Sequence, residues 1–415
     1  MSWPTTTFRD VTLRTRTWNP DKEVRDSVKY VDVSAVSRDE LQIVSPAHLT
    51  RDIPSRARKI VECGDTIFAT VRPTLRRVSM VPAELDGEIA STAFCVLRPN
   101  RAEIDPDFLF FAAISDPVLN EVGGLQSGAS YPAIRDTDVL DCTISLPPMG
   151  EQKAIAAALT ICRKAIVDQH KALRFLDELK CAAMRELFTR GLRGEAQKDS
   201  EIGPVPESWD VARLGEIATL ERGRFLHRPR NEPRFYGGNT PFVQTGDVVR
   251  SNGRISAFSQ SLNDDGVEIS RVFATGTILI TIAANIGYTG ILQMDCACPD
   301  SLVGITPSAA ITNVYLEQFL RSQQSEMDRQ APVGTQKNIN IEFLRPWPIV
   351  VPTLAEQSEI TAILDAIDAK IDLHRRKKVV LEDLFRALLH KLMTAEIRVA
   401  DLDLSALESA QEVAT

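Results

Sequence analysis

The sequence lacks the features that would place it in a membrane or outside the cell. Among its 415 residues no uninterrupted apolar run reaches the roughly 18 residues that a membrane-spanning helix needs. The first ten residues, MSWPTTTFRD, do not combine a basic start with an apolar stretch, so they do not form a secretory signal. We therefore expect a cytoplasmic protein without a membrane segment.

Metal-binding and catalytic motifs are missing as well. Seven cysteines are scattered along the chain, and the close pair Cys296 and Cys298 has no second pair at zinc-ligand spacing. We therefore expect buried apolar thiols and no metal site. The five histidines are dispersed, and no motif of a nucleotide-binding loop, a zinc protease or a serine hydrolase occurs. The sequence thus predicts no catalytic residue.

The chain does contain an internal repeat. LPPMGEQ at residues 146–152 matches VPTLAEQ at 351–357, and the match continues downstream at a constant offset of 205. Upstream, GDTIFATV from Gly64 matches GTILITIA from Gly276 at an offset of 212. FRDVTL at residues 8–13 aligns loosely with WDVARL at 209–214. Similarity at a fixed offset indicates one structural unit that is used twice.

Each repeat combines short β-rich runs with one long helix. Runs broken by glycine, proline and asparagine predict a compact α+β domain. In both helices eight of ten residues at alternating spacings of four and three are apolar, which is typical of a coiled-coil seam. We therefore predict an α+β fold in which two similar domains are separated by two long helices that form an antiparallel coiled coil, with pseudo-twofold symmetry. The predicted segments are domain 1 (1–147), helix 1 (148–190), a linker (191–208), domain 2 (209–352), helix 2 (353–395) and an acidic tail (396–415).

Polar residues interrupt the two predicted seams. They are Gln169 and Lys180 in the first helix and His374 and Lys378 in the second. In an antiparallel pair Gln169 and His374 fall in the same layer, and a buried polar layer can fix the register of two helices. A solvated crossing of the helices is the alternative interpretation.

A glutamate stands in the first turn of each predicted helix. We expect Glu151 and Glu356 to accept free backbone N–H groups and to complement the helix dipole. This structural role is favoured over catalysis by either carboxylate.

The charge pattern indicates local rather than general binding of nucleic acid. The chain carries 48 basic and 56 acidic residues, a net charge of −8, which argues against a surface that binds nucleic acid everywhere. Acidic residues concentrate in 103–147 and in the tail 396–415, whereas arginines gather in two short segments. The arginine fork can bind guanine or phosphate through two hydrogen bonds, although charge alone is also typical of a solvated face. The clustered arginines that we select are Arg72, Arg76 and Arg77 in the first repeat and Arg222, Arg224 and Arg228 in the second.

A second pair of segments lies shortly before the long helices. They read GASYPAIRDTDV from Gly128 and GTQKNINIEFL from Gly334. Framework residues match between the repeats while these loop residues differ, so two copies of one scaffold would recognise two unlike targets. Amide and hydroxyl side chains can bind adenine edges or phosphates. The loop candidates are Ser130 and Tyr131 in the first repeat and Thr335, Gln336, Lys337 and Asn338 in the second.

These motifs together resemble a known family. The pattern P-x-x-x-E-Q-x-x-I stands at residues 147–155 and 352–360, each after a β-rich domain with a late loop, and PESW followed by LGE opens the second repeat at 206–216. The sequence resembles the specificity subunit of type I restriction-modification enzymes over nearly the whole chain except the acidic tail. The first repeat differs because FRDVTL stands where the second repeat has the PESW and LGE motifs.

The resemblance implies a division of labour between subunits. Two target recognition domains would each bind one half of a split double-stranded DNA sequence, and the helices would set the spacing. Two modification subunits would dock on the helices, bring S-adenosylmethionine and methylate adenine, and restriction (motor-nuclease) subunits would join them. The specificity subunit would then have no cofactor and no catalysis of its own. The selected arginines and loop residues would lie at the first half-site in the first repeat and at the second half-site in the second.

Two other classes of function remain possible from the sequence. The coiled coil could belong to a scaffold or protein-interaction module without DNA specificity, in which case DNA binding and its salt dependence would be absent. A self-sufficient DNA methyltransferase is disfavoured because the glycine-rich cofactor loop is missing.

Overall fold

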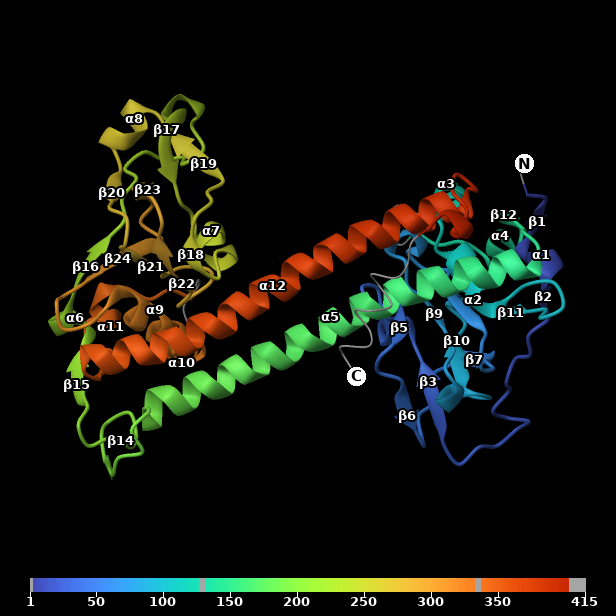
Figure 1. The fold of residues 1–415 in the computed structure, drawn as a ribbon, viewed down its shortest axis with the longest axis horizontal. Coiled ribbons are helices and arrows are strands. Elements are labelled where there is room, and N and C mark those ends of the chain that lie inside the picture. The colour runs from blue at the N-terminus through green and yellow to red at the C-terminus, as the bar shows by residue number, and fades with distance from the viewer. Residues whose placement is uncertain (1–2, 127–131, 333–336, 403–415) are drawn as a thin grey trace. The chain divides into compact units, whose positions relative to one another are not determined.

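The computed structural model describes residues 3–126, 132–332 and 337–402. Its internal contacts divide the chain into two units, with residues 1–173 and 374–415 in unit 1 and residues 174–373 in unit 2. The long helices are α5 (Met149–Arg190) and α12 (Leu354–Met393), and each unit holds one α+β domain together with part of both helices (Figure 1).

The domain of unit 1 contains two four-stranded sheets. The first sheet has the order β6 (Ala47–Leu49), β3 (Val28–Val31), β10 (Ile89–Ser91) and β7 (Ala57–Ile60), with β3 and β10 parallel. The second has the antiparallel order β2 (Thr12–Leu13), β11 (Phe94–Pro99), β8 (Thr66–Ala69) and β9 (Val78–Met80). Two short pairs complete it, β1 (Thr5–Thr7) with β12 (Thr143–Ser145) and β4 (Val36–Ser37) with β5 (Gln42–Ile43).

Helices cover the second sheet of unit 1. They are α1 (Phe8–Val11), α2 (Pro106–Ala113), α3 (Asp116–Leu125) and α4 (Asp136–Leu140). The Asp105 side chain caps α2 by accepting two backbone N–H groups, and Pro106 occupies the first turn, where its missing N–H costs nothing. Six consecutive residues of α2, 108–113, are buried, and they share one core with Ile155 of α5 and Leu388 of α12.

The domain of unit 2 repeats this plan. One sheet has the order β16 (Ala218–Arg222), β24 (Leu302–Pro307), β21 (Ile278–Thr281), β22 (Thr289–Leu292) and β18 (Gly253–Ile255), with β18 and β22 parallel. The other has the order β19 (Gln260–Leu262), β17 (Tyr236–Phe242), β23 (Cys296–Cys298) and β20 (Arg271–Phe273). The short pairs are β13 (Gln197–Lys198) with β14 (Val205–Pro206) and β15 (Asp210–Arg213) with β25 (Pro348–Val351).

In its described residues unit 2 has six α-helices besides the long pair, two more than unit 1. They are α6 (Leu214–Ile217), α7 (Thr245–Arg250), α8 (Asp264–Glu268), α9 (Asn313–Ser322), α10 (Gln324–Gln330) and α11 (Ile341–Leu344). Thr312 caps α9 as Asp105 caps α2. Tyr315 and Phe319 of α9 make edge-to-face contacts with Phe188 of α5, with ring centroids 5.5 and 5.3 Å apart.

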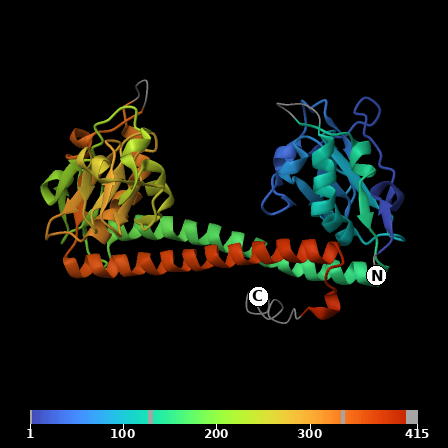
Figure 2. The same ribbon diagram turned by 90° about the horizontal axis from the view of Figure 1, so that it is seen from above.

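The two long helices run antiparallel inside each unit. In unit 1 the Cys162 thiol contacts the carbonyl of Leu381, and Gln169 contacts His374. In unit 2 Lys180 contacts Asp368. From Cys162 to Gln169 the residue number rises along α5, whereas the contacted residue on α12 falls from Leu381 to His374, so the two helices are antiparallel. Within each unit the α+β domain lies along one side of its part of the helix pair (Figure 2).

The predicted seam and the α+β class are confirmed. None of the twenty seam residues selected from the sequence is classed as exposed. Gln169 Oε1 lies 2.8 Å from His374 Nδ1, so the two polar residues do share a layer, and both are partly buried.

The structure corrects the alignment of the two N-terminal segments. The strand pairs β1–β12 and β15–β25 are equivalent, and α1 and α6 follow them directly. FRDVTL therefore corresponds to LGEIAT and not to WDVARL. Trp3 is then the counterpart of Trp209. Sequence comparison missed this because only the tryptophan and the short helix are shared.

Among the described residues no single helix is long and apolar enough to cross a membrane. The bent pair α2 and α3 would pass such a test by length and composition, and most of its apolar residues are buried in the core of unit 1, Leu125 being exposed.

Candidate nucleic-acid interface

A glutamine at the start of each long helix joins that helix to its domain. Gln152 Oε1 accepts the N–H of Asp105, the cap of α2, at 2.8 Å. Its amide nitrogen donates to the carbonyls of Glu103 and Pro147 at 3.1 and 2.9 Å. Gln357 makes the same three bonds in unit 2, with Thr312 N (2.9 Å), Ala310 O (3.0 Å) and Pro352 O (3.0 Å). Both glutamines are fully buried, so the glutamine of the repeated E-Q motif fixes each long helix to the α+β domain of its unit.

The neighbouring glutamates bind tryptophans and do not cap their own helices. Glu151 Oε2 accepts the indole N–H of Trp3 at 3.2 Å, and Glu356 Oε2 accepts that of Trp209 at 3.0 Å. Glu356 Oε1 also accepts the backbone N–H of Leu192, just after α5. The prediction that each glutamate caps its own helix was therefore wrong, and the two carboxylates hold tryptophan side chains instead.

In unit 1 the arginines of the first cluster lie in the hairpin that connects β8 and β9. Arg72 and Arg76 both have left-handed backbone conformations, with φ of 49° and 54°, and both are exposed. The Arg72 N–H donates to the carbonyl of Pro132 at 2.7 Å, and Val71 forms a β-bridge with Ala133. The hairpin thus lies beside Pro132 and Ala133 of the segment that begins at Gly128.

The three arginines of this hairpin differ in how far they are engaged. The Arg76 guanidinium makes only a loose, exposed ion pair with Asp116 at 3.4 Å. The Arg77 guanidinium donates to the carbonyls of Val33 and Val36 at 2.9 and 2.6 Å and is half-buried. Arg76 is therefore the better placed of these two to contact a ligand, while Arg77 braces the loop before β4.

In unit 2 two of the three selected arginines contact one acidic residue, Asp300. Arg222 Nε donates to the carbonyl of Asp300 at 2.7 Å, and Arg228 forms an ion pair with its carboxylate at 2.9 Å. Arg224 donates to the carbonyl of Ser270 at 2.9 Å. All three arginines are exposed.

Backbone hydrogen bonds connect this cluster to the segment that begins at Gly334. Ile282 N–H donates to the carbonyl of Ser301, next to Asp300, and Ile339 N–H donates to the carbonyl of Ile282. Asn338 is exposed and forms a β-bridge with Ala283, and Lys337 pairs with Asp328 at 3.0 Å. The remaining predicted loop residues, Ser130, Tyr131, Thr335 and Gln336, lie outside the described residues.

The repeat reveals basic residues that the sequence search did not select. The N–H of Ile60 donates to the carbonyl of Arg16 in unit 1, and the N–H of Arg271 donates to that of Arg224 in unit 2. Arg16 thus lies in the segment of unit 1 that corresponds to the Arg224 segment of unit 2, and it is exposed. The signal in the sequence is the short motif RTRT at residues 14–17, which is too small to stand out without the structural alignment.

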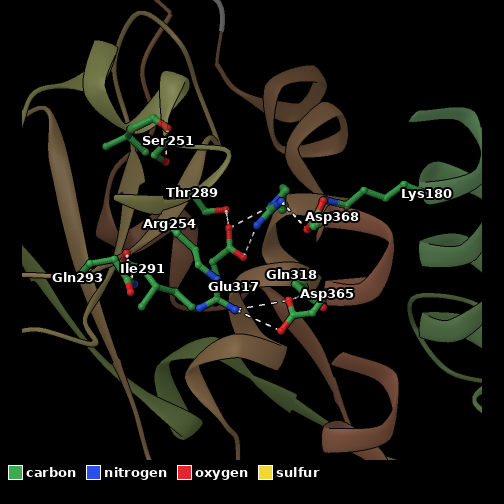
Figure 3. Close-up of polar contacts among 12 residues, drawn as sticks. Lys180, Ser251, Arg254, Thr289, Ile291, Gln293, Glu317, Gln318, Asp365 and Asp368 are labelled. Carbon is green, nitrogen blue, oxygen red and sulfur yellow. Dashed lines mark hydrogen bonds and ion pairs between the residues drawn. The ribbon is translucent and has the colours of Figure 1, made fainter. Parts of the chain in front are cut away.

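A buried ionic network anchors the domain of unit 2 to the helices (Figure 3). Lys180 of α5 pairs with Asp368 of α12 at 2.5 Å, and Arg321 of α9 lies 3.7 Å from the same carboxylate. Arg321 also binds Glu317 through two hydrogen bonds, at 3.0 and 2.6 Å, and Thr289 donates to Glu317 at 2.9 Å. Burial, with the nearby Arg321 charge, lowers the pKa of Lys180 from its ordinary value.

A second ion pair extends this anchor. Arg254 of β18 pairs with Asp365 of α12 at 3.2 Å, and Gln318 of α9 donates to the same carboxylate at 2.8 Å (Figure 3). Gly253 makes room for the network, because a Cβ atom there would lie 1.6 Å from Arg321 Nη2.

The equivalent positions in unit 1 are largely aromatic. Phe385 stands where unit 2 has Lys180, and its ring centroid lies 6.1 Å from that of Phe111. Phe110 stands where unit 2 has Glu317, and the guanidinium of Arg163 lies 5.0 Å from its ring centroid. One architecture therefore uses two different chemistries to join domain and helix.

The prediction of buried thiols is confirmed for five cysteines and is wrong for Cys63 and Cys181, which are exposed. All seven are free, and Cys296 and Cys298 are buried in β23. Burial raises the pKa of the Cys296 thiol to about 12.

Two copies of one α+β domain, each packed on long antiparallel helices, define a class of proteins built from a duplicated domain-and-helix unit. The family model for the type I restriction modification DNA specificity domain matches residues 8–174 and 206–383. The chain belongs to this family.

Relatives and solved structures agree with this assignment. A putative type I restriction enzyme MjaX specificity subunit from Methanocaldococcus jannaschii is 24% identical over 410 residues, covering 96% of this chain and 94% of the relative. The MjaVIII specificity subunit from the same organism is 27% identical and covers 76% of each chain. A chain from a structural study of complex assembly and conformational transition in a type I R-M system has a TM-score of 0.61 at 28% identity, covering 95% of this chain and 98% of that one. The S subunit from M. genitalium, with a TM-score of 0.60 at 15% identity, shares the fold.

Proposed function

We propose that this chain is the specificity subunit of a type I restriction-modification complex and binds a split DNA sequence in the cytoplasm. Each α+β domain recognises one half of the target. The observation that carries the proposal is the repeat itself: equivalent hairpins stand on one framework, but Arg72 and Arg76 in unit 1 correspond to Ala284 and Gly287 in unit 2. Identical scaffolds with unlike tips suit two unlike half-sites.

The DNA contacts that we propose combine the two arginine clusters and the two loops. Arginine can bind guanine through two hydrogen bonds, and asparagine or glutamine can bind adenine in the same way. The proposed residues are Arg72, Arg76, Arg77, Ser130 and Tyr131 for the first half-site and Arg222, Arg224, Arg228, Thr335, Gln336, Lys337 and Asn338 for the second.

Catalysis would belong to partner subunits. Two modification subunits would supply S-adenosylmethionine and methylate adenine, and restriction subunits would supply motor and nuclease activities. Exposed apolar side chains on the long helices support docking of protein partners there. In unit 2 they are Phe175, Leu179, Leu354, Ile363 and Leu373, and in unit 1 they are Val379, Val380 and Leu384.

Docking can be tested on the assembled complex. Phe175 is 64% exposed and Val380 is 65% exposed, so replacing either with aspartate should leave the fold intact. We expect Phe175→Asp and Val380→Asp to lose co-elution with the modification subunits in size-exclusion chromatography. Lys171→Asp, at a 65% exposed polar side chain of α5, serves as a control for the added charge.

Mapping methylated adenines across the genome tests the function as a whole. Cells with the gene should carry methylation at a two-part motif with a fixed spacer, and cells without it should lose that methylation. Unchanged methylation would contradict the proposal and favour a scaffold without DNA specificity. Methyl transfer by the purified chain alone would instead indicate a self-sufficient methyltransferase.

A further inference from the structure

We propose that the hairpin between β21 and β22 determines the second half-site, with Asn285 and Tyr288 contacting the bases. Neither residue belongs to the arginine cluster or to the loop selected from the sequence. The inference rests on the proposed DNA-binding function and adds to it the residues that distinguish the two halves.

The β21–β22 hairpin of unit 2 is equivalent to the β8–β9 hairpin of unit 1. Thr281 N–H donates to the carbonyl of Tyr288 at 2.9 Å, as Ala69 N–H donates to that of Arg77 at 3.0 Å. Left-handed conformations occur at Ala284 and Gly287, with φ of 65° and 79°, matching those at Arg72 and Arg76. The two hairpins thus share the closing hydrogen bond and two left-handed positions, although that of unit 1 is one residue longer. The hairpin of unit 2 contains no arginine.

The two hairpins also lie in equivalent places. Ala283 forms a β-bridge with Asn338, and Val71 forms one with Ala133, so each hairpin lies beside the loop that precedes the long helix. The hairpin of unit 2 is therefore equivalent in position to the hairpin of unit 1, whose arginines were selected as DNA contacts from the charge pattern.

The hairpin of unit 2 is preorganised. Thr281 Oγ1 accepts the N–H of Tyr288 at 3.0 Å and donates to the carbonyl of Asn285, while Gln324 donates to the carbonyl of Ile286 at 2.8 Å. Thr289, directly after the hairpin, donates to the buried Glu317 (Figure 3). The backbone is therefore held firmly, which lowers the entropy cost when exposed side chains bind a ligand.

The side chains of Asn285 and Tyr288 have the chemistry that base contacts need. Asn285 is exposed, and its amide has no hydrogen-bond partner within the described part of the chain. An asparagine amide can donate to N7 and accept from the N6 amino group of adenine in the major groove. Tyr288 is 38% exposed and offers an aromatic ring and a hydroxyl. We therefore assign an adenine contact to Asn285 and a neighbouring base contact to Tyr288.

The amide donates through its nitrogen to the adenine N7, and its oxygen accepts from the adenine amino group, so a probe that removes N7 isolates one bond. The test uses the complex with the modification subunits and duplexes that carry the motif mapped in cells. Duplexes with 7-deazaadenine at single positions of the second half should bind wild type more weakly at one position. Asn285→Ala should bind the unmodified duplex roughly ten- to hundredfold more weakly and lose its sensitivity to that replacement.

Three further variants separate recognition from folding. Asn239→Ala, at an exposed asparagine of β17, should retain wild-type binding and sensitivity. Tyr288→Phe should retain the fold and Tyr288→Ala should weaken the second half alone. If Asn285→Ala keeps wild-type affinity and the same 7-deaza sensitivity, or if it weakens both halves equally, the assignment is wrong. Absence of any two-part motif in wild-type cells would instead contradict the proposed function itself.

Discussion

Arg76 and Arg77 are neighbours in the sequence but have different surroundings. The Arg77 guanidinium satisfies two backbone carbonyls, so its loss would disturb the loop that it braces. The Arg76 guanidinium is nearly half-exposed and has one loose partner, so its loss would affect mainly a bound ligand.

Replacing Arg76 therefore tests the first half-site alone. We expect Arg76→Ala to cost about 1–3 kcal/mol of binding free energy at the first half and to relax base selection there. Fluorescence anisotropy with duplexes altered in either half would measure this. Arg101→Ala removes an exposed arginine of the same unit away from the hairpin and should bind like wild type. Equal loss of discrimination in both halves would count against the assignment.

His170 gives unit 1 a pH-dependent stability. Burial lowers the pKa of His170 from its ordinary value, with a contribution from Lys378, although Glu40 and Glu382 oppose the shift. The unfolded chain then binds a proton that the folded chain does not, so the free energy of unfolding falls as pH drops from about 6.5 toward the lower folded pKa.

Chemical denaturation between pH 7.5 and pH 5 should reveal this dependence. We expect His170→Gln to flatten the part of the pH profile just below about 6.5. His48→Gln, at an exposed histidine of the same unit, should leave the profile unchanged. A wild-type profile with no acid-side decrease near that pH would refute the role of His170.

At the scale of elements, the junction between domain and helix differs between the units. α9 meets the helices through an ionic network, whereas α2 meets them through phenylalanines. Buried ion pairs contribute little net stability but cost much when one partner is lost. The network of unit 2 is therefore sensitive to which of its charges is removed.

Removing Asp368 should destabilise unit 2 more than removing Lys180. Asp368→Ala leaves Lys180 and Arg321 without their shared carboxylate, and we expect a loss of about 3 kcal/mol in the free energy of unfolding. Lys180→Ala leaves Asp368 with Arg321, so the loss should be about 1 kcal/mol. Thermal or urea unfolding would measure both. Arg190→Ala, which breaks the exposed pair with Glu186, should change little, and equal losses for Asp368→Ala and Lys180→Ala would disprove the shared-partner account.

At the scale of the whole molecule, the net charge of −8 coexists with proposed DNA binding. Five of the acidic residues stand in the segment 396–415, and eight stand in 103–147. Arg72 and Arg76 of the hairpin are exposed in unit 1, and Arg222 and Arg228 beside Asp300 are exposed in unit 2. Local positive charge, rather than the total, therefore governs contact with phosphates.

The salt dependence of DNA binding checks this at the same scale. If about six arginines neutralise phosphates, the affinity of the complex for its target should fall on the order of a thousandfold between 50 and 200 mM salt. Anisotropy titrations at several salt concentrations would give the slope. An affinity that does not change with salt would favour the scaffold interpretation. Arg222→Ala should reduce the slope by about one.

Much of the architecture was predictable because its signals are periodic or repeated. The E-Q motif and the apolar spacing from Ile155 to Leu187 predict two long antiparallel helices, and the structure confirms the shared layer of Gln169 and His374. The burial of Cys296 follows from its place in an apolar β-run. These features depend on spacing along the chain, which one sequence shows directly.

Only the tertiary structure decided how distant segments meet. The partnership of Trp3 with Glu151 joins residues 148 positions apart, and the Lys180–Asp368 pair joins residues 188 positions apart. The equivalence of Gly287 with Arg76 depends on left-handed backbone conformations and strand register, which residue identity hides. The sequence by itself determined the repeat, the helices and their seam, because local periodicity and hydrophobic burial fix them. Tertiary packing decided which side chains remain exposed at the hairpins, since long-range hydrogen bonds and ion pairs engage some of them and leave others for a ligand.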